Sequence, residues 1–552
     1  MATSRSDSGD AEHGGVSLRK DGAAPAANAP RAELSFGRVL IANRGEIAVR
    51  IIRACRELGL ESVAVYSDAD ANALHVRLAD SAVRLGPPPS TESYLRIDRI
   101  LEVAAATGAD AVHPGYGFLA ERAEFASRVR EAGLVFVGPA AEAIEALGDK
   151  LHARRLARDA GIPVVPGTLD PAATDRPDQL DAVVRDAEGV GLPLLVKAAA
   201  GGGGRGMRRV ERINDLPAAL LEGSREAAAA FGDGRVYLER EIRPARHIEV
   251  QLLGDLNGAV VALGERDCSI QRRHQKLVEE APAPGLTVEE RADLHGMAVT
   301  IGKAAGLSNA ATAEFLREPD GQFHFLEVNT RLQVEHGVTE LVSGVDIVRE
   351  QLRLAAGLPL SDAVHVAASR ATTPSGHAIE VRISAEDPGR DFAPTPGTIR
   401  HWLMPGGPGV RVDTATEAGD RVPPEYDNLI AKVMVHAGDR AAAIGRLARA
   451  LAETEIAGIQ TTLPFHRFVA REPSFAEAAL STEWVGAHWD GHAEAERVQR
   501  LARLAAALGF PRLQPRPSVL AQRQSEEHPL PRDPGAWSAA ALDAAVDRWP
   551  GV

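Results

Sequence analysis

Short apolar runs alternate with helix-periodic segments over the N-terminal part of the chain. Residues 38–41 (RVLI), 63–67 (VAVYS) and 110–114 (DAVHP) have the length and apolar character of buried strands. Apolar positions recur at helical spacing over 47–58, 96–107 and 121–132, and a further strand is expected at 135–139. This alternation predicts a parallel, Rossmann-like α/β domain over residues 36–149.

From Lys150 onward the pattern changes to short strands with alternating polar and apolar residues. Strands are expected at 161–168, 192–198, 235–242, 247–255 and 259–270, with a helix between the first two. Residues 311–318 and 322–331 form a predicted hairpin around the turn Pro319-Asp320-Gly321. The mixture predicts a second, α+β domain over residues 150–360.

The C-terminal part divides into a strand-rich region and an extension. Residues 370–487 contain strand patterns at HAIEVRI, GTIRHWLMP and IAKVMV and a helix pattern at 440–452, which predict a third domain. The helical and Pro-rich extension, 488–552, carries two apolar stripes, Val498-Leu501-Ala505-Leu508 before Gly509 and Trp537-Leu542-Val546-Trp549. Residues 1–35 lack aromatic side chains and are expected to be a disordered tail.

Composition excludes several classes of protein. The formal net charge is −14, which argues against a nucleic-acid or membrane-surface protein. No apolar run approaches the roughly 20 residues of a membrane span, and the first residues lack a secretory h-region. With only Cys55 and Cys268, a disulfide framework is excluded. We therefore expect a cytoplasmic protein in a reducing compartment.

Almost all of the positively charged residues are arginines. The chain has 62 lysines and arginines together, of which only six are lysines: Lys20, Lys150, Lys197, Lys276, Lys303 and Lys432. Lysine is a compact point charge whereas arginine is a planar fork, so the two are not interchangeable. Apart from chance occurrences such as Lys20, the rare lysines are candidates for positions that require an ammonium group.

The segment KAAAGGGGRGM, residues 197–207, is the most unusual stretch of the chain. Four consecutive glycines lose much backbone freedom on folding. Taken alone, such a run is more often a flexible surface hairpin. The alternative is a loop that covers a phosphate group, because backbone N–H groups without a Cβ can approach an anion closely.

The predicted hairpin carries a candidate metal site. Glu327 and Asn329 are two residues apart on one strand, so their side chains face the same way, and Glu314 lies on the paired strand. Three oxygen ligands of this kind suit Mg²⁺. Carboxylates on a strand are more often solvated, but the apolar residues around these indicate burial, which requires a compensating charge.

Two further segments carry candidate catalytic groups. RLQVEH, residues 331–336, follows the hairpin and places an arginine, an amide and a carboxylate at alternate positions, which suits a small planar anion and a proton acceptor. SIQRRHQK contributes His274 and Lys276, and EVRISAED contributes Arg382. Each of these residues alone is more simply explained by a salt bridge.

Together, the motifs resemble the biotin carboxylase family of the ATP-grasp superfamily. The resemblance rests on VLIANRGEIAVRI, HPGYGFLAERAEFA, GDK, KAAAGGGGRGM, LERE, RDCSIQRRHQK, AEFL, FLEVNTRLQVEH, EVRISAEDP and YDNLIAK, in this order over residues 36–487. It implies a Rossmann-like N-terminal domain, a central ATP-grasp domain with a mobile lid at about 170–240, and a biotin carboxylase C-terminal domain. By the same resemblance the glycine run belongs to the lid over the ATP phosphates.

The resemblance also implies roles for individual residues. Glu314, Glu327 and Asn329 match the metal-site positions, which are expected to hold Mg²⁺ or Mn²⁺ as a pair of ions, and Glu335 matches the general base. The bicarbonate and biotin pocket is matched by Lys276, Arg331, Gln333, Val334 and Arg382. The ATP site is matched by Lys150, Lys197, Gly202, Gly203, Gly204, Met207, Glu239, Arg240, Ile242, His247, Gln271, His274 and Leu316.

The implied reaction is the ATP-dependent carboxylation of biotin through carboxyphosphate. Glu335 would remove the proton of bicarbonate and Arg382 would stabilise the enolate-like charge on biotin. An unperturbed glutamate pKa near ~4.3 makes a weak base, so burial or neighbouring charges are expected to tune it. Departures from the family pattern are Ala200 for the first lid glycine, Gly337 for a proline, and Arg240, Ala120 and Arg122 for Lys, Ser and Asn.

Partners follow from a missing residue. Relatives that carry their own biotin attach it to a lysine near the C-terminus, but this sequence has no lysine after Lys432. We therefore expect a separate biotin carboxyl carrier protein and a separate carboxyltransferase, a homodimer as in many family members, and a docking role for 488–552. Two rival hypotheses are another ATP-grasp ligase, which RLQVEH with Arg382 argues against, and a scaffold protein with a degenerate nucleotide site.

Overall fold

The computed structural model describes residues 34–171, 177–199 and 207–507. The described residues up to Glu494 belong to one compact unit, and those from Ala495 onward belong to a second. Among the described residues, no helix combines the length and the apolar character that a bilayer span requires.

A parallel sheet forms the N-terminal part of the first unit, as predicted. Its strands lie in the order β3-β2-β1-β4-β5, and all neighbours are parallel. They are β1 (Arg38–Ile41), β2 (Glu61–Ser67), β3 (Ser81–Gly86), β4 (Ala111–His113) and β5 (Val135–Phe136). The associated helices are α1 (Gly45–Glu57), α2 (Leu74–Leu78), α3 (Ile97–Thr107), α4 (Ala123–Glu131) and α5 (Ala141–Gly148). Strand β3 was not predicted, because only its last two residues are buried.

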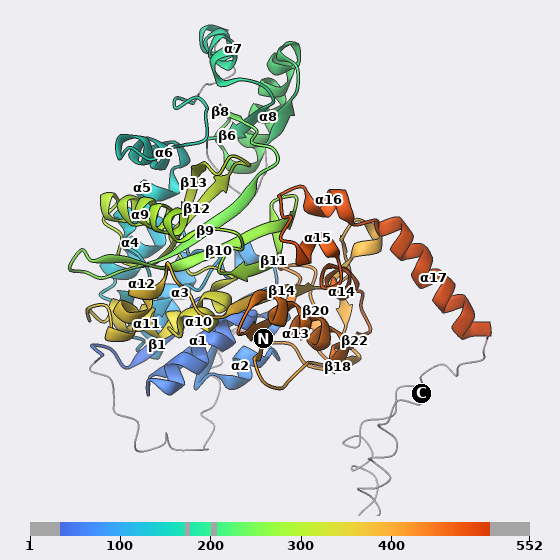
Figure 1. Ribbon diagram of the computed structural model, residues 1–552. Coiled ribbons are helices and arrows are strands. Elements are labelled where there is room, and N and C mark those ends of the chain that lie inside the picture. The colour runs from blue at the N-terminus through green and yellow to red at the C-terminus, as the bar shows by residue number, and fades with distance from the viewer. Residues whose placement is uncertain (1–33, 172–176, 200–206, 508–552) are drawn as a thin grey trace, which may run out of the picture. The chain divides into compact units, whose positions relative to one another are not determined.

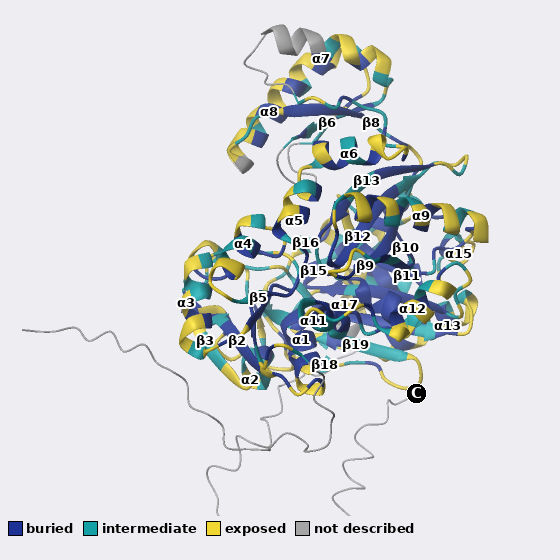
Figure 2. Ribbon diagram, turned by 90° about the vertical axis from the view of Figure 1, so that its left-hand side faces the viewer, coloured by how far each residue is buried: buried dark blue, intermediate teal, exposed yellow. Residues whose placement is uncertain are grey.

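An antiparallel sheet runs through both of the following predicted domains. Its strand order is β13-β12-β9-β10-β11-β14-β21-β19, so the 150–360 and 370–487 regions share one continuous sheet. The strands are β9 (Arg246–Gly254), β10 (Val260–Arg272), β11 (Gln275–Ala281), β12 (Asn309–Arg317), β13 (Phe323–Asn329), β14 (His377–Ser384), β19 (Val410–Thr414) and β21 (Leu429–Ala437). Figure 2 shows its central strands as largely buried.

A smaller sheet, β7-β6-β8, carries the segment on either side of the glycine run. It consists of β6 (Leu194–Ala198), β7 (Arg208–Val210) and β8 (Val236–Arg240), with α7 (Pro177–Val190) and α8 (Leu216–Phe231) beside it (Figure 1). The predicted strand at 161–168 is wrong: only isolated bridges form, from Val164 to Phe325 and from Gly167 to Glu239. Pro163 and Pro166 lack the N–H groups that a strand needs for its ladder.

Several of the remaining helices pack on the antiparallel sheet. Helices α9 and α10 pack on β10, and α13 packs on β14 and β21. Their bounds, with those of the other helices and short strands, are α6 (Lys150–Asp159), α9 (Val288–Ala304), α10 (His336–Ser343), α11 (Ile347–Ala355), α12 (Asp362–Arg370), α13 (Arg440–Glu453), α14 (Leu463–Val469), α15 (Pro473–Ala476), α16 (Trp484–His488), α17 (Gly491–Ala507), β15 (Glu386–Asp387), β16 (Ala393–Pro394), β17 (Gly397–Thr398), β18 (His401–Leu403), β20 (Arg421–Val422) and β22 (Glu455–Ala457).

Gly337, where the family pattern has proline, lies in the first turn of α10 against a buried methionine. A Cβ added to Gly337 would lie 2.2 Å from Sδ of Met434 and 3.4 Å from Oε2 of Glu380. Met434 is fully buried on β21 and fills the space that a side chain at position 337 would need. Gly337 and Met434 are therefore matched in volume.

The close contact with Met434 predicts that alanine destabilises the protein at position 337 but not at position 296. Gly337→Ala should lower the free energy of unfolding by about 1–3 kcal/mol because the added methyl group overpacks the core. Gly296→Ala is the control, since nothing lies within 4 Å of a Cβ there and alanine favours the interior of α9 by about 0.5–1 kcal/mol. Urea unfolding measures both changes.

A second substitution tests the cause. In the Gly337→Ala/Met434→Ala protein, the loss of stability should be smaller than the sum of the two single losses by more than about 1 kcal/mol. Additive losses would show that Met434 does not cause the cost at position 337.

Candidate active site

Lys276 lies at the centre of a buried cluster of carboxylates. Its Nζ is 2.9 Å from Oε1 of Glu314 and 2.6 Å from Oε1 of Glu335, and it also donates to Oε2 of Glu249. All three carboxylates are buried. Removing one cation from water is unfavourable, and here the compensation comes from three anions on three different elements.

Two arginines complete the cluster. Arg382 on β14 donates from Nη2 to Oε2 of Glu335 at 2.8 Å and from Nε to Oε1 of Glu279 at 2.5 Å. Arg266 on β10 is fully buried and donates from Nε to Oε1 of Glu249 at 2.5 Å. Both oxygens of Glu335 therefore accept a hydrogen bond from a cation.

The sequence predicts that surroundings tune Glu335, and the structure gives the direction. Burial opposes the charge of this carboxylate, but Lys276, Arg382 and Arg266 outweigh it and hold the pKa of Glu335 well below its usual range. In this arrangement Glu335 is ionised and is held as an acceptor. It becomes a stronger base only if one of its cations turns toward another anion.

The predicted metal-site residues lie together on the β12–β13 hairpin. Glu314 and Glu327 are directly opposed across the two strands, and Asn329 donates from Nδ2 to Oε1 of Glu314 at 2.9 Å. Glu327 is 2.6 Å from Nζ of Lys150 at the start of α6. Two carboxylates and an amide oxygen are a ligand set that fits a hard cation such as Mg²⁺.

Arg331 and Gln333 extend this set toward Glu335. Arg331 donates to Oδ1 of Asn329 at 2.9 Å and to Oε1 of Gln333 at 2.9 Å, and its Nε is 2.9 Å from Glu121. Gln333 donates to Oε1 of Glu314 at 3.1 Å. The backbone carbonyl of Val334 accepts a hydrogen bond from Lys432 at 2.8 Å. The RLQVEH segment is thus tied to the hairpin on one side and to β21 on the other.

The predicted nucleotide residues divide into described and undescribed ones. Lys197 on β6 pairs with Glu239 on β8, and Arg154 on α6 donates to the same carboxylate at 2.5 Å. Arg240 is 2.6 Å from Glu318. Ile242 and Leu316 pack together against Val165, and Met207 immediately precedes β7. Ala200, Gly202, Gly203 and Gly204 lie outside the described residues.

Three predicted residues lie near Lys276: His247 and Gln271 on strands, and His274 in the turn before it. His247 on β9 is 3.1 Å from Oε2 of Glu314, and Gln271 is buried near the end of β10. His274 and Arg273 form the β10–β11 turn and both have a positive φ, of 66° and 48°. A positive φ is unfavourable for residues other than glycine, so contacts with neighbouring residues must stabilise it.

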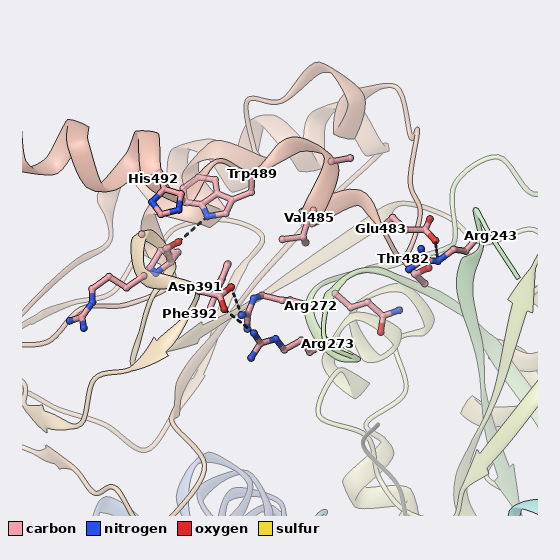
Figure 3. Close-up of a pocket in the computed structure, with 17 residues that line it drawn as sticks. Arg243, Arg272, Arg273, Asp391, Phe392, Thr482, Glu483, Val485, Trp489 and His492 are labelled. Carbon is pink, nitrogen blue, oxygen red and sulfur yellow. Dashed lines mark hydrogen bonds and ion pairs between the residues drawn. The ribbon is translucent and has the colours of Figure 1, made fainter. Parts of the chain in front are cut away.

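A second segment with unusual backbone geometry meets this turn. Asp391 accepts from Arg272 and is 2.8 Å from Arg273, and Asp391 and Phe392 also have a positive φ. Arg272, Arg273, Asp391 and Trp489 line a pocket of about 800 Å³. Figure 3 shows Asp391 beside the two arginines, with Trp489 above them. Of the predicted site residues that the structure describes, only Gln271 lines this pocket, which therefore lies beside the outer end of the hairpin that carries Lys276.

The comparisons with known proteins decide the family. The model of the biotin carboxylase N-terminal domain matches residues 35–144, and that of the biotin carboxylase C-terminal domain matches residues 380–487. Between them, residues 149–363 match the ATP binding domain of the carbamoyl-phosphate synthase L chain. The chain belongs to the biotin carboxylase family. The expected family and fold class are confirmed.

Individual biotin carboxylases are similar to this chain over most of its length. The biotin carboxylase of Haemophilus influenzae is 47% identical over 451 residues, which are 81% of this chain and 98% of the relative. The biotin carboxylase of a Nostoc species is 48% identical over 452 residues, which are 82% of this chain and 99% of the relative. A biotin carboxylase structure from Campylobacter jejuni, titled as a β,γ-ATP complex, has a TM-score of 0.78 at 42% identity and covers 82% of this chain and 99% of that one.

A second related structure was solved as a complex with ligands. The biotin carboxylase domain dimer of the Hydrogenobacter thermophilus 2-oxoglutarate carboxylase, in complex with MgADP, ADP and bicarbonate, has a TM-score of 0.78 at 43% identity. It covers 83% of this chain and 98% of that one. The likeness extends over the whole of that domain.

Sequence reasoning missed several residues of this biotin carboxylase site. Glu249 and Arg266 form a fully buried ion pair beneath it. Glu121 pairs with Arg331, and Arg154 pairs with Glu239. One signal was available: His247, Glu249 and Gln251 alternate along β9, so they share one face of the sheet. Arg154 gave no signal, since a helical arginine is usually on the surface.

The cluster predicts a pH-dependent stability defect when Lys276 is replaced. Glu335 has a depressed pKa in the folded protein, so its stabilising effect is present above the unfolded value of about 4.5 and is lost as the pH falls through the folded value. In Lys276→Met that carboxylate stays buried without its main partner, so burial should raise its pKa above the unfolded value and let it take up a proton near pH 5. The loss in free energy of unfolding should be about 3–5 kcal/mol at pH 7 and smaller at pH 5.

Urea unfolding at the two pH values measures the loss. Lys303→Met is the control, because Lys303 lies exposed in the last turn of α9, and it should change stability little at either pH. A loss for Lys276→Met that is equal at pH 5 and pH 7 would contradict the role given to the ammonium group.

Proposed function

We propose that the chain carboxylates biotin with ATP and bicarbonate and releases ADP and phosphate. The observation that carries this proposal is the Lys276–Glu335–Arg382 arrangement next to the Glu314, Glu327 and Asn329 oxygens. It combines a buried carboxylate, cations on both of its oxygens and a hard-cation ligand set within one sheet. The family membership and the titles of the related structures support the same reaction.

The side chains supply a sequence of roles. Lys150 and Lys197 would bind ATP phosphates, for which they would exchange their present carboxylate partners, Glu327 and Glu239. Arg331, Gln333 and Lys276 would orient bicarbonate against the terminal phosphate. A Mg²⁺ ion at Glu314, Glu327 and Asn329, or a pair of ions, would neutralise charge on the phosphoryl group.

Proton transfer then depends on Glu335. A bicarbonate anion that attracts Lys276 and Arg382 would weaken their hold on Glu335, and the pKa of this carboxylate would rise toward that of a useful base. Deprotonated bicarbonate would attack the terminal phosphorus of ATP and displace ADP, and the resulting carboxyphosphate would break down to CO₂ and phosphate, which would accept the proton from the biotin nitrogen. Arg382 would then stabilise the negative charge on biotin while its nitrogen attacks CO₂.

The reaction predicts a simple activity measurement. Purified protein with Mg-ATP and bicarbonate should release ADP, and free biotin should stimulate the release. Glu335→Gln should lower the biotin-stimulated rate by at least about 100-fold, because it removes the base and keeps the shape of the side chain. ADP is measured with a coupled enzyme assay.

The control for this measurement is Glu280→Gln. Glu280 is buried on the same strand as Lys276 but pairs with His377 and Arg440, away from the site. It should retain biotin stimulation. ATP binding without any biotin-stimulated ADP release in the unmodified protein would favour a nucleotide-binding scaffold instead.

We further propose that biotin arrives on a separate carrier protein and that the C-terminal extension helps to dock the carrier or the carboxyltransferase. Helix α17 presents Val498, Leu501 and Leu504 with 44%, 52% and 58% of their surfaces exposed. Apolar side chains at three- to four-residue spacing on one helix are typical of a partner-binding face. The homodimer and the cytoplasmic location also remain proposals.

If the extension docks a partner, changes in it should weaken binding of that partner but not the reaction with free biotin. Leu501→Gln/Leu504→Gln, and separately deletion of residues 512–552, should leave ADP release with free biotin within about twofold of the unmodified protein, because the described residues of the candidate site all belong to the first unit. Both should weaken pull-down of the carrier or carboxyltransferase at least about tenfold. Arg500→Gln on the same helix is the surface control, and unchanged pull-down would contradict the proposal.

A further inference from the structure

Two buried glutamates lie side by side behind the active-site ion pair. Glu279 on β11 and Glu380 on β14 are directly opposed in the antiparallel register, so their side chains project from the same face of the sheet. Both have no exposed surface. Glu380 is in turn opposed to Met434 on β21, and its Oε2 lies near Gly337 of α10.

The two carboxyl groups are poorly supplied with hydrogen-bond donors. Glu279 uses Oε1 to accept from Arg382, and its Oε2 has no hydrogen-bond partner. Neither oxygen of Glu380 has one. Three buried carboxyl oxygens without a donor would be unstable if both groups were ionised, because buried anions require compensation.

A proton shared by Glu279 and Glu380 would supply the missing hydrogen-bond donor. A protonated Glu380 can donate its O–H to Oε2 of Glu279, which supplies a hydrogen bond to two of the three oxygens at once. Like charges on adjacent carboxyl groups also prevent simultaneous ionisation. We propose that Glu279 and Glu380 share one proton in the folded protein, and that this proton leaves the positive charge of Arg382 available to Glu335 and to substrate.

The charges around the pair are consistent with one shared proton. Glu279 faces Arg382, Glu335 and Lys276, and Glu380 faces Lys432, Glu279, Arg382 and Glu335. Burial raises the pKa of Glu279 to about 7, against the effect of Arg382, and burial raises the pKa of Glu380 well above its usual range, against the effect of Lys432. With both groups ionised, Arg382 would face three carboxylates.

The inference extends the proposed function to a positioning role. In the proposed function, Arg382 stabilises the negative charge that develops on biotin. The electric field of Arg382 at that position depends on whether the two glutamates behind it are ionised. Neither glutamate touches the proposed substrate positions. They act through Arg382, and the loss of their proton at high pH should therefore weaken the reaction without disturbing ATP binding.

Stability against pH tests the shared proton without any catalysis. The unfolded chain releases the proton above a pKa of about 4.5, whereas the folded pair retains it, so the pair's contribution to stability is present below that pH and is lost as the pH rises toward the folded value. Glu380→Gln cannot ionise and its amide can still donate to Glu279. The Tm of Glu380→Gln minus that of the unmodified protein should therefore rise steadily from pH 5 to pH 8.

A flat difference would overturn the proposal, since it would mean that no proton is taken up on folding. Glu280→Gln is the matched control on the same strand, because Glu280 is ion-paired and its Tm difference should not rise with pH. Glu279→Gln is a second variant in case Glu380→Gln does not fold, because neutralising either member should produce the same rise.

The role toward Arg382 is tested by the pH profile of biotin-stimulated ADP release. In Glu380→Gln, the alkaline midpoint of kcat should move upward by at least about one pH unit, and KM for ATP should not follow it. An alkaline midpoint unchanged from that of the unmodified protein would overturn the role. If the unmodified protein shows no biotin-stimulated release, the proposed function fails while the Tm measurement still decides on the proton.

Discussion

The described structure depends on the ammonium group of Lys276, which is largely withdrawn from solvent. Lys276 reaches three carboxylates that come from β9, β12 and the segment before α10, and each of these would lose a cationic partner in the interior without it. A cluster of this kind holds its members in fixed positions because every one of them would lose a partner if it moved. The chemistry of Glu335 is therefore set by the same contacts that hold the sheet and α10 together.

A continuous sheet makes this cluster possible. Because β11 pairs with β14, the strand that carries Lys276 also positions Arg382 on the neighbouring strand, although the two residues are far apart in the sequence. Helix α10 then lies on this face and brings Glu335 between them. Further contacts join α1 to the same assembly, since Glu46 is 3.0 Å from Lys432 and Arg50 is 3.0 Å from Glu340.

Local patterns predict much of this arrangement, and long-range pairing accounts for what they miss. The apolar runs and helical periodicity predict the parallel sheet, and the Pro319-Asp320-Gly321 turn predicts the hairpin that opposes Glu314 and Glu327. The strand predicted at 161–168 fails because its two prolines remove the N–H groups that pairing requires. Glu279 and Glu380 could not be paired from the sequence, because their contact depends on a register between strands a hundred residues apart.

The scarcity of lysine has a practical consequence. Of the lysines in the part of the chain that the structure describes, Lys150, Lys197, Lys276 and Lys432 have side chains between 25% and 0% exposed, all within ion pairs, and Lys303 alone is exposed. Amine-reactive reagents attack only unprotonated, accessible groups. Acylation of the four paired lysines, followed by mass spectrometry against Lys303 as an internal standard, would thus record how often the site opens in solution.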